Sequence, residues 1–273
     1  MAYTVLNFPL STGKSIPAIG LGLGGINRSQ VVEAVLQAIK VGYRHFDTAI
    51  IYGTEAALGE ALAEAFRSGL VRREEVFITS KLWSSEHEPE DVLSSVKNSL
   101  SLLQLDYIDL YLIHWPLKLK KGVELQVKDD DYLPLDIKVE RHPVWQQKKL
   151  KPFCDAKGIL VSGWSPLGSP GSFYGTRDVI TNPIVESIAK KHGKTPAQVA
   201  LRWGVQTGAI VLPRSFNPKR VAENFEIFSW ELSEDDINEI SRIEQRRIGL
   251  ADMFCNPTSG PYKTVQELWD GDL

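Results

Sequence analysis

The sequence predicts an α/β fold in which helices cover a sheet of parallel strands. Short, nearly continuous apolar runs alternate with amphipathic helical stretches, which is typical of strands that are buried on both faces. The length of 273 residues suits one α/β barrel, and no interior segment has the composition of a linker. We therefore expect a single domain over residues 1–273.

The elements follow from this alternation in chain order. In the first half, strands are expected at 18–23, 45–49, 76–82 and 108–114, with helices at 29–41, 55–68 and 89–104. In the second half we expect a helix over 143–157, an apolar segment over 159–168, a helical region over 182–205, a strand within 210–216 and a helix from Arg220. A last helix over 233–243 begins with Ser233, and Asp236 three residues later makes the start close to a capping box. The tail from 244 is predicted to be irregular.

Composition excludes several classes of function. The net charge is −3 and the pI about 6.0, so there is no electrostatic basis for binding nucleic acid or an acidic membrane surface. We see no signal peptide and no apolar run that approaches about 18 residues. Cys154 and Cys255 lack the spacing of a zinc or redox site and indicate a reducing compartment. We expect a cytoplasmic monomer without a metal.

One short motif favours a different fold. Residues 20–25, GLGLGG, satisfy G-x-G-x-x-G, and Asp47 follows at a strand end as a Rossmann dinucleotide site requires. The other interpretation is a Gly-rich strand end in another α/β fold. Against the Rossmann unit, Ile26, Asn27 and Arg28 separate the third glycine from the start of the helix at Ser29, where that glycine should stand.

Four polar residues stand at or just after the ends of successive predicted strands. Asp47 is near the end of one strand, Tyr52 lies in the following loop, Lys81 is near the end of the next, and His114 ends the fourth. Each residue alone has an ordinary explanation. Asp47 and Lys81 could be solvated loop charges, Tyr52 a packed ring, and His114 a hydrogen-bonded polar group. Because the carboxyl ends of parallel barrel strands meet at one face, all four can converge there.

The chemistry that this set suggests is proton donation to a carbonyl oxygen. A tyrosine has a pKa near 10, which is too high for an acid at neutral pH unless a nearby ammonium favours the phenolate. Lys81 can supply that charge, Asp47 can hold Lys81, and His114 can orient the substrate oxygen. A hydride donor must then supply the reducing equivalent.

The second half contains a candidate anion site. Residues 213–224, PRSFNPKRVAEN, follow an apolar strand and present Arg214, Ser215 and Arg220 around the start of a helix. Arginines and a helix N-terminus both favour phosphate. A basic helix start on a solvated surface remains the alternative.

These residues together resemble the aldo-keto reductases, most closely the plant group that includes chalcone, codeinone and methylecgonone reductases. The resemblance covers nearly the whole chain and rests on six segments. They are GYRHFDTAIIYGTE (42–55), FITSKLW (77–83), DYIDLYLIHWP (106–116), WSPLGSPGS (164–172), LPRSFNPKRVAEN (212–224) and GPYKTVQELWDGDL (260–273). It implies a (β/α)8 TIM barrel and no Rossmann fold.

The resemblance also implies a role for each site residue. It makes Asp47, Tyr52, Lys81 and His114 catalytic, with Tyr52 as the acid, and it implies NADPH/NADP+ as cofactor and a small carbonyl compound as substrate. His114, where a glutamate would indicate steroid double-bond reduction, favours carbonyl reduction. Trp83, His114 and Trp115 would form the substrate pocket. The implied cofactor-binding residues are Gly22, Leu23, Asp47, Trp164, Ser165, Leu167, Ser169, Arg214, Ser215, Phe216, Arg220, Glu223 and Asn224.

The implied cofactor roles divide along the nucleotide. Trp164 would stack on the nicotinamide, where the family usually has Tyr or Phe. The Ser165–Ser169 stretch would line the pyrophosphate. Arg214, where the family usually has Lys, would bind the 2′-phosphate with Ser215 and Arg220, while Glu223 and Asn224 would hold adenine. Near the ribose, Gly22-Leu23-Gly24 replaces the family's Gly-Thr-Trp.

The largest departure from the family lies near residues 138–140, which we call the seam. After His114 the family has a substrate loop, a helix, a strand ending in Ser-Asn, a further helix and a strand ending in Gln-Val-Glu. Here the loop runs to about Lys138, and Val139-Glu140 resemble the end of that later strand. About one and a half βα units are missing, which is roughly 40–50 residues at about 30 per unit. The Ser-Asn pair and the Gln, which would hold the nicotinamide carboxamide, are missing with them.

Two functions stay open at this point. The count of four strands before the seam and two after it predicts an incomplete barrel with two unpaired edges and exposed apolar surface. Either the shortened barrel still reduces an aldehyde or ketone with NADPH, or the chain is an inactive remnant that at most binds NADP(H).

Overall fold

The structure is a computed structural model. Among the residues that it describes, six parallel strands lie at the centre. Four of them form one sheet in the order β3-β4-β5-β6, and β9 pairs with β10 in a second. The bounds are β3 Leu21–Gly22, β4 His45–Asp47, β5 Phe77–Leu82, β6 Leu110–Ile113, β9 Val161–Gly163 and β10 Ala209–Val211. A parallel bridge between Ile19 and Val211 joins the two sheets, so β10 lies beside the first strand. The four parallel strands predicted before the seam and the two predicted after it are confirmed within the described residues.

Part of the chain is described only incompletely. The structure describes residues 5–10, 12–25, 28–114, 140–172, 175–250, 252, 255, 257–258, 262–269 and 271, and the backbone alone of 117–119 and 132–134. Trp115 and the seam residues 138 and 139 lie outside these ranges.

Glu140 extends the row of strands by one position. It forms a parallel bridge with Trp164, and the Arg141 amide donates to the Trp164 carbonyl at 3.3 Å. The order of neighbours is therefore Glu140, β9, β10, β3, β4, β5, β6. These neighbours fill seven of the eight strand positions of a barrel, so a complete barrel would join β6 to the strand position of Glu140 through one further strand. The chain folds as a TIM barrel that is incomplete between these two positions.

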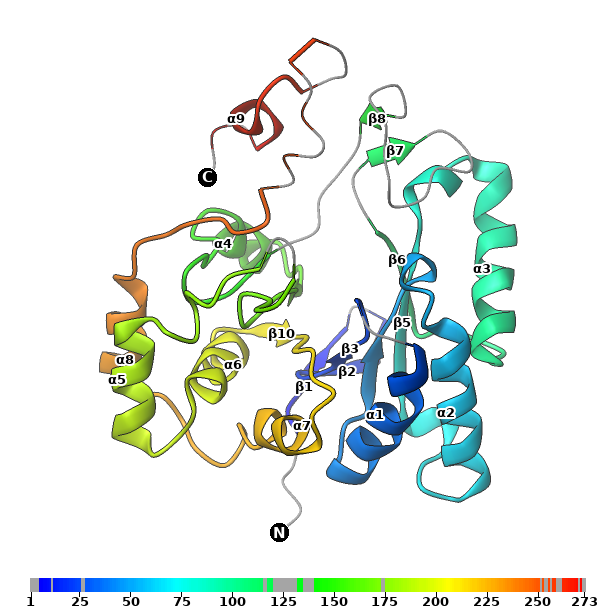
Figure 1. Cartoon of the computed structure of the whole chain (residues 1–273), viewed down its shortest axis with the longest axis horizontal. Helices are drawn as coiled ribbons and strands as arrows, with labels where there is room; N and C mark the ends of the chain where they lie inside the picture. The colour runs from blue at the N-terminus through cyan, green and yellow to red at the C-terminus, as the bar shows by residue number, and fades with distance from the viewer. Residues whose placement is uncertain are drawn as a thin grey trace.

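Helices surround the strands, as Figure 1 shows. They are α1 Arg28–Val41, α2 Glu55–Arg67, α3 Pro89–Leu103, α4 Leu150–Ala156, α5 Pro183–His192, α6 Pro196–Gln206, α7 Pro218–Phe225, α8 Glu234–Ser241 and α9 Val265–Leu268, with 3-10 turns at Ile50–Tyr52, Arg73–Glu75 and Ser84–Glu86. Several begin where the sequence offers a cap. Asn182, Thr195, Asn217 and Ser233 each accept a hydrogen bond from a backbone N–H of the first turn. The Ser233 and Asp236 capping box is confirmed.

Two antiparallel hairpins complete the described secondary structure. They pair β1 Asn7–Pro9 with β2 Ser15–Pro17, and β7 Leu117–Leu119 with β8 Tyr132–Pro134. Phe8 and Ile16 of the first hairpin pack against Phe77, at the start of β5, and Ile210 of β10. The hairpin therefore covers the amino ends of the strands, and the predicted catalytic residues lie at the opposite ends.

Residues from both sides of the seam share the largest apolar core. It contains Leu23, Phe46 and Ile78 from the first half together with Leu201 and Phe225 from the second. A second cluster lies between α5, α6 and α8. The shared core supports the proposal of a single domain.

Two helix predictions need correction. The helix expected over 143–157 begins only at Leu150, because an antiparallel bridge between His142 and Trp145 makes a turn, and Gln147 has a φ of 60°. The helical region over 182–205 is two helices. Gly193 ends α5 in the left-handed conformation, and the Thr195 cap followed by Pro196 starts α6.

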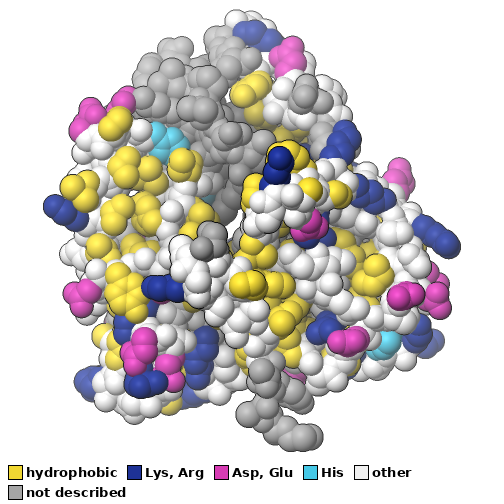
Figure 2. Space-filling model, turned by 180° about the vertical axis from the view of Figure 1, so that it is seen from behind, with side chains coloured by type: hydrophobic (Ala, Val, Ile, Leu, Met, Phe, Trp, Pro, Cys, Tyr) yellow, Lys and Arg dark blue, Asp and Glu magenta, His cyan; other side chains and the backbone are white. Residues whose placement is uncertain are grey.

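Apolar side chains are exposed beside both ends of the row of strands. Leu93 of α3 and Ile113 of β6 are 62% and 63% exposed, while Phe153 of α4 and Ile159 are 57% and 51% exposed on the other side. Figure 2 shows that apolar side chains reach the surface over much of the rear face. Within the described ranges, no helix is long and apolar enough to cross a membrane.

Candidate active site

The four predicted catalytic residues lie at the carboxyl ends of neighbouring strands. Asp47 is the last residue of β4, Lys81 is the penultimate residue of β5, and His114 directly follows β6. Tyr52 ends the 3-10 turn after β4. Because β4, β5 and β6 are parallel and adjacent, these ends meet at one face.

A buried ion pair forms the base of the site. The Lys81 ammonium donates to Asp47 Oδ1 at 2.7 Å and to the Thr48 carbonyl at 2.5 Å. The side chains of Lys81 and Asp47 are 0% and 8% exposed. Two charges removed from water in this way are stable only when they are paired and hydrogen-bonded. The Thr48 carbonyl is a partner that sequence reasoning missed, because strand-end counting identifies side chains and not backbone groups.

The tyrosine and histidine meet above this pair. The Tyr52 hydroxyl and His114 Nε2 are 3.2 Å apart, and their rings meet edge to face with centroids at 5.1 Å. The Lys81 ammonium lies 4.9 Å from the centre of the Tyr52 ring. Trp83 packs edge-on against His114 with ring centroids 5.5 Å apart. The structure thus brings together all four residues and one predicted wall of the substrate pocket.

The loop that carries Tyr52 is fixed locally. Gly53 ends the 3-10 turn with a φ of 65°, and the Thr48 and Thr54 hydroxyls hydrogen-bond at 2.9 Å across its base. Gly24 lies against the Tyr52 ring, since a Cβ there would be 3.2 Å from the ring carbon Cζ. The absence of a side chain at Gly24 therefore allows the loop after β3 to approach the Tyr52 ring.

The predicted pyrophosphate-binding stretch is a strained turn. Ser165 and Ser169 have φ angles of 51° and 50°, and their hydroxyls hydrogen-bond to each other. Positive φ at residues other than glycine is uncommon and often marks a functional loop. Trp164, which precedes the turn, is half-buried. Leu167 packs against both main core clusters, and Leu23 packs within the first.

Arg214 lies between two loops. Its guanidinium donates to the Gly24 and Gly25 carbonyls at 2.9 and 3.3 Å and to the Ser172 hydroxyl at 2.9 Å. Ser172 is a second partner that the prediction missed, although the motif WSPLGSPGS contains it. Arg214 therefore joins the loop after β3 to the loop after β9.

The rest of the predicted 2′-phosphate and adenine site surrounds the start of α7. Ser215 is buried and its hydroxyl has no hydrogen-bond partner within the described part of the chain. Arg220 is exposed in the first turn of α7 and Phe216 is half-buried. Glu223 forms an ion pair with Lys219 at 3.7 Å, and Asn224 is buried.

The comparisons with known proteins decide the family. The sequence model described as "Aldo/keto reductase family" matches residues 18–129 and 120–245. This chain belongs to the aldo/keto reductase family. The match falls into two segments that overlap at residues 120–129, shortly before the seam.

Similar reductases and a similar structure are known. The chain is 40% identical to aldo-keto reductase family 4 member C11 of Arabidopsis thaliana, over all of both chains. It is 44% identical to rhazimal reductase 2 of Alstonia scholaris, over 97% of each. A solved aldose reductase from Schistosoma japonicum superimposes with a TM-score of 0.79 at 33% identity, covering 89% of this chain and 94% of that one.

The alignment lengths bear on the internal deletion. The match to the Arabidopsis aldo-keto reductase extends over 316 aligned positions and includes all 273 residues of this chain. The difference of 43 positions agrees with the roughly 40–50 residues, at about 30 per βα unit, expected to be missing at the seam. As an aldo/keto reductase the chain is an oxidoreductase of a family that reduces small carbonyl compounds with a nicotinamide cofactor.

Proposed function

We propose that this chain reduces an aldehyde or ketone to an alcohol with NADPH, and that Tyr52 is the general acid. The observation that carries this is the contact between the Tyr52 hydroxyl and His114 Nε2, directly above the buried Lys81–Asp47 pair. The Tyr52 hydroxyl is in contact with the His114 ring, and the fixed positive charge of Lys81 lies 4.9 Å from the centre of the Tyr52 ring.

Each of the four residues has a distinct task in this proposal. Tyr52 donates its proton to the carbonyl oxygen as that oxygen becomes negative. The Lys81 charge, 4.9 Å from the ring centre, stabilises the negative charge left on the tyrosine oxygen. Asp47 and the Thr48 carbonyl keep the ammonium in place. His114 and Trp83 orient the substrate oxygen toward the tyrosine.

The second half of the chain fits a phosphorylated dinucleotide. NADPH, when bound, supplies the hydride. The buried Ser215 hydroxyl lacks a partner among the described residues and can donate to a phosphate oxygen. Arg214 directly precedes Ser215 in the chain, and Arg220 lies in the first turn of the following helix, α7. Their positive charge favours a 2′-phosphate and therefore NADPH over NADH. The Trp164 indole offers an apolar face for the nicotinamide ring.

The test is consumption of NADPH by the purified 273-residue chain with a generic aromatic aldehyde. Turnover in the wild type that falls about 10²- to 10⁴-fold in Tyr52→Phe supports the proposal, because the fold keeps the ring and loses only the acid. Equal turnover in both proteins refutes the role of Tyr52. A folded wild type that quenches NADPH fluorescence without oxidising it identifies the chain as an inactive remnant that binds the cofactor.

A further inference from the structure

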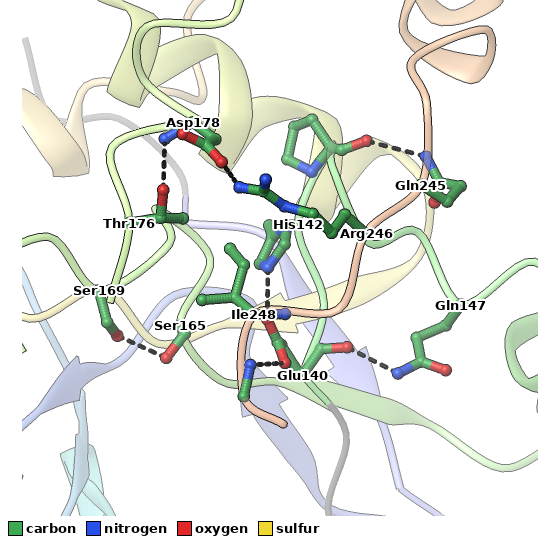
Figure 3. Close-up of polar contacts among 12 residues, drawn as sticks. Glu140, His142, Gln147, Ser165, Ser169, Thr176, Asp178, Gln245, Arg246 and Ile248 are labelled. Atoms are coloured by element: carbon green, nitrogen blue, oxygen red, sulfur yellow. Dashed lines mark hydrogen bonds and ion pairs between the residues drawn. The ribbon is translucent and has the colours of Figure 1, made fainter. Parts of the chain in front are cut away.

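Glu140, at the seam, is buried and bonded on every side. Its side chain is 1% exposed. Oε1 lies 2.7 Å from His142 Nε2 and accepts from the Ile248 amide at 3.1 Å, while Oε2 accepts from the Gly249 amide at 2.8 Å. Figure 3 shows the carboxylate between the histidine and the backbone of the C-terminal segment. A buried carboxylate is tolerated only with such donors, so the segment at 248–249 is held where it lies.

The C-terminal segment is attached to the same turn at further points. The Arg246 amide donates to the Val144 carbonyl at 2.7 Å, and the Gln146 amide donates to the Gln245 side chain at 2.6 Å. The Arg247 guanidinium lies 4.7 Å from the Trp145 ring centre and 3.7 Å from that of Trp269. Residues 245–249 therefore form one fixed strip along the turn that follows Glu140.

This strip ends against Trp164. A Cβ added to Gly249 would lie 2.8 Å from Trp164 Cη2 and 3.1 Å from Glu140 Oε2, so the glycine backbone packs directly between the indole and the carboxylate. Glu140 is also the backbone neighbour of Trp164 through their parallel bridge. Glu140 thus fixes Trp164 in two ways. It bridges to the backbone of Trp164, and it holds Gly249, which packs against the edge of the indole ring.

We propose that Glu140 is a positioning residue for the cofactor, which holds the C-terminal segment against Trp164 and so fixes the indole face that receives the nicotinamide ring. The inference rests on the proposed function and deepens it. The resemblance assigns nicotinamide contacts to a Ser-Asn pair and a Gln that this chain lacks. Without those contacts, Trp164 contributes a larger share of the free energy of nicotinamide binding, so this binding depends more strongly on Glu140, which fixes Trp164.

The test compares two ligands by fluorescence titration. NADPH carries both halves of the cofactor, whereas adenosine 2′,5′-bisphosphate carries the adenine and the 2′-phosphate but no nicotinamide. In Glu140→Gln the amide keeps the size of the side chain but loses the charge and one acceptor. We expect the Kd for NADPH to rise about 3- to 10-fold, the value of one aromatic stacking contact, and the Kd for the bisphosphate to stay unchanged. Glu239→Gln, on the exposed side of α8, is the matched control and should change neither.

A second variant keeps the test decisive if Glu140→Gln does not fold. Gly249→Ala keeps the Glu140 carboxylate and His142, and its Cβ would press most closely on the Trp164 ring, at 2.8 Å, and less closely on Glu140 Oε2, at 3.1 Å. It should also weaken NADPH binding selectively. An equal rise in Kd for both ligands would mean that Glu140 has a general structural role. An unchanged Kd for NADPH would mean that Trp164 needs no support. Either result overturns the inference, while the proposed function stands. A folded wild type that binds neither ligand overturns both.

Discussion

The ion pair between Lys81 and Asp47 allows structural and chemical roles to be separated by measurement. Both side chains are nearly inaccessible to water and their charged atoms are 2.7 Å apart. Lys81→Met or Asp47→Asn leaves one buried charge without its partner, and each should lower the free energy of unfolding by about 3–5 kcal/mol. The double variant removes both charges, so its loss should be smaller than the sum of the single losses by about 1–3 kcal/mol.

Activity should follow a different pattern from stability. The double variant regains part of the stability but still lacks the charge beside Tyr52, so its turnover should remain at least about 10²-fold below that of the wild type. Urea unfolding followed by tryptophan fluorescence and NADPH oxidation measure the two quantities. Lys219→Met, which breaks only an exposed pair with Glu223, is the control and should cost less than about 1 kcal/mol. Additive losses of stability, or a double variant with wild-type turnover, would refute the reasoning.

Two further predictions concern the fold. Burial lowers the pKa of His45 to about 4, against about 6.5 in the unfolded chain. Between these two pH values the unfolded state binds a proton that the folded state does not bind. The free energy of unfolding should therefore fall by up to about 3 kcal/mol as the pH drops from 6.5 to 4. Urea titrations at several pH values should show this slope, and His45→Gln should flatten it; an equal slope in the variant would assign the effect elsewhere. Gly59→Ala in α2 should lower the free energy of unfolding by about 1–3 kcal/mol, because the added Cβ would lie 2.6 Å from the Leu102 carbonyl oxygen of α3. A thermal melt that matches the wild type would instead show that α2 and α3 can move apart to make room for the Cβ.

The strand pattern was sufficient to predict that the four candidate catalytic residues meet at one face. Asp47, Lys81 and His114 are identified because each is the polar end of an apolar run, and parallel neighbours bring such ends together. Tyr52 follows because only a short turn separates it from Asp47. The missing strands were also predictable, since counting βα units needs only the periodicity of the sequence.

Contacts between distant parts of the chain were not predictable in this way. The Glu140 carboxylate bonds to amides at 248 and 249, more than a hundred residues later, and no spacing rule connects them. Residues 143–147 were predicted as the start of a helix because their apolar residues have a helical period, yet the Val144 carbonyl and the Gln146 amide bond to the C-terminal segment. Arg214 was predicted as a phosphate ligand from its charge, and its bonds to Gly24 and Ser172 depend on loops whose shape the sequence alone does not define.

The bridge between Ile19 and Val211 has a consequence for how the chain is made. The first strand can pair on one side with β4 as soon as residue 47 has left the ribosome, but its other neighbour, β10, is synthesised much later. At about 5–20 residues per second, the interval between residues 19 and 211 is roughly 10–40 s. During that time the amino-terminal strands have a free edge, so chaperones that cover such edges have their longest opportunity to act before β10 is complete.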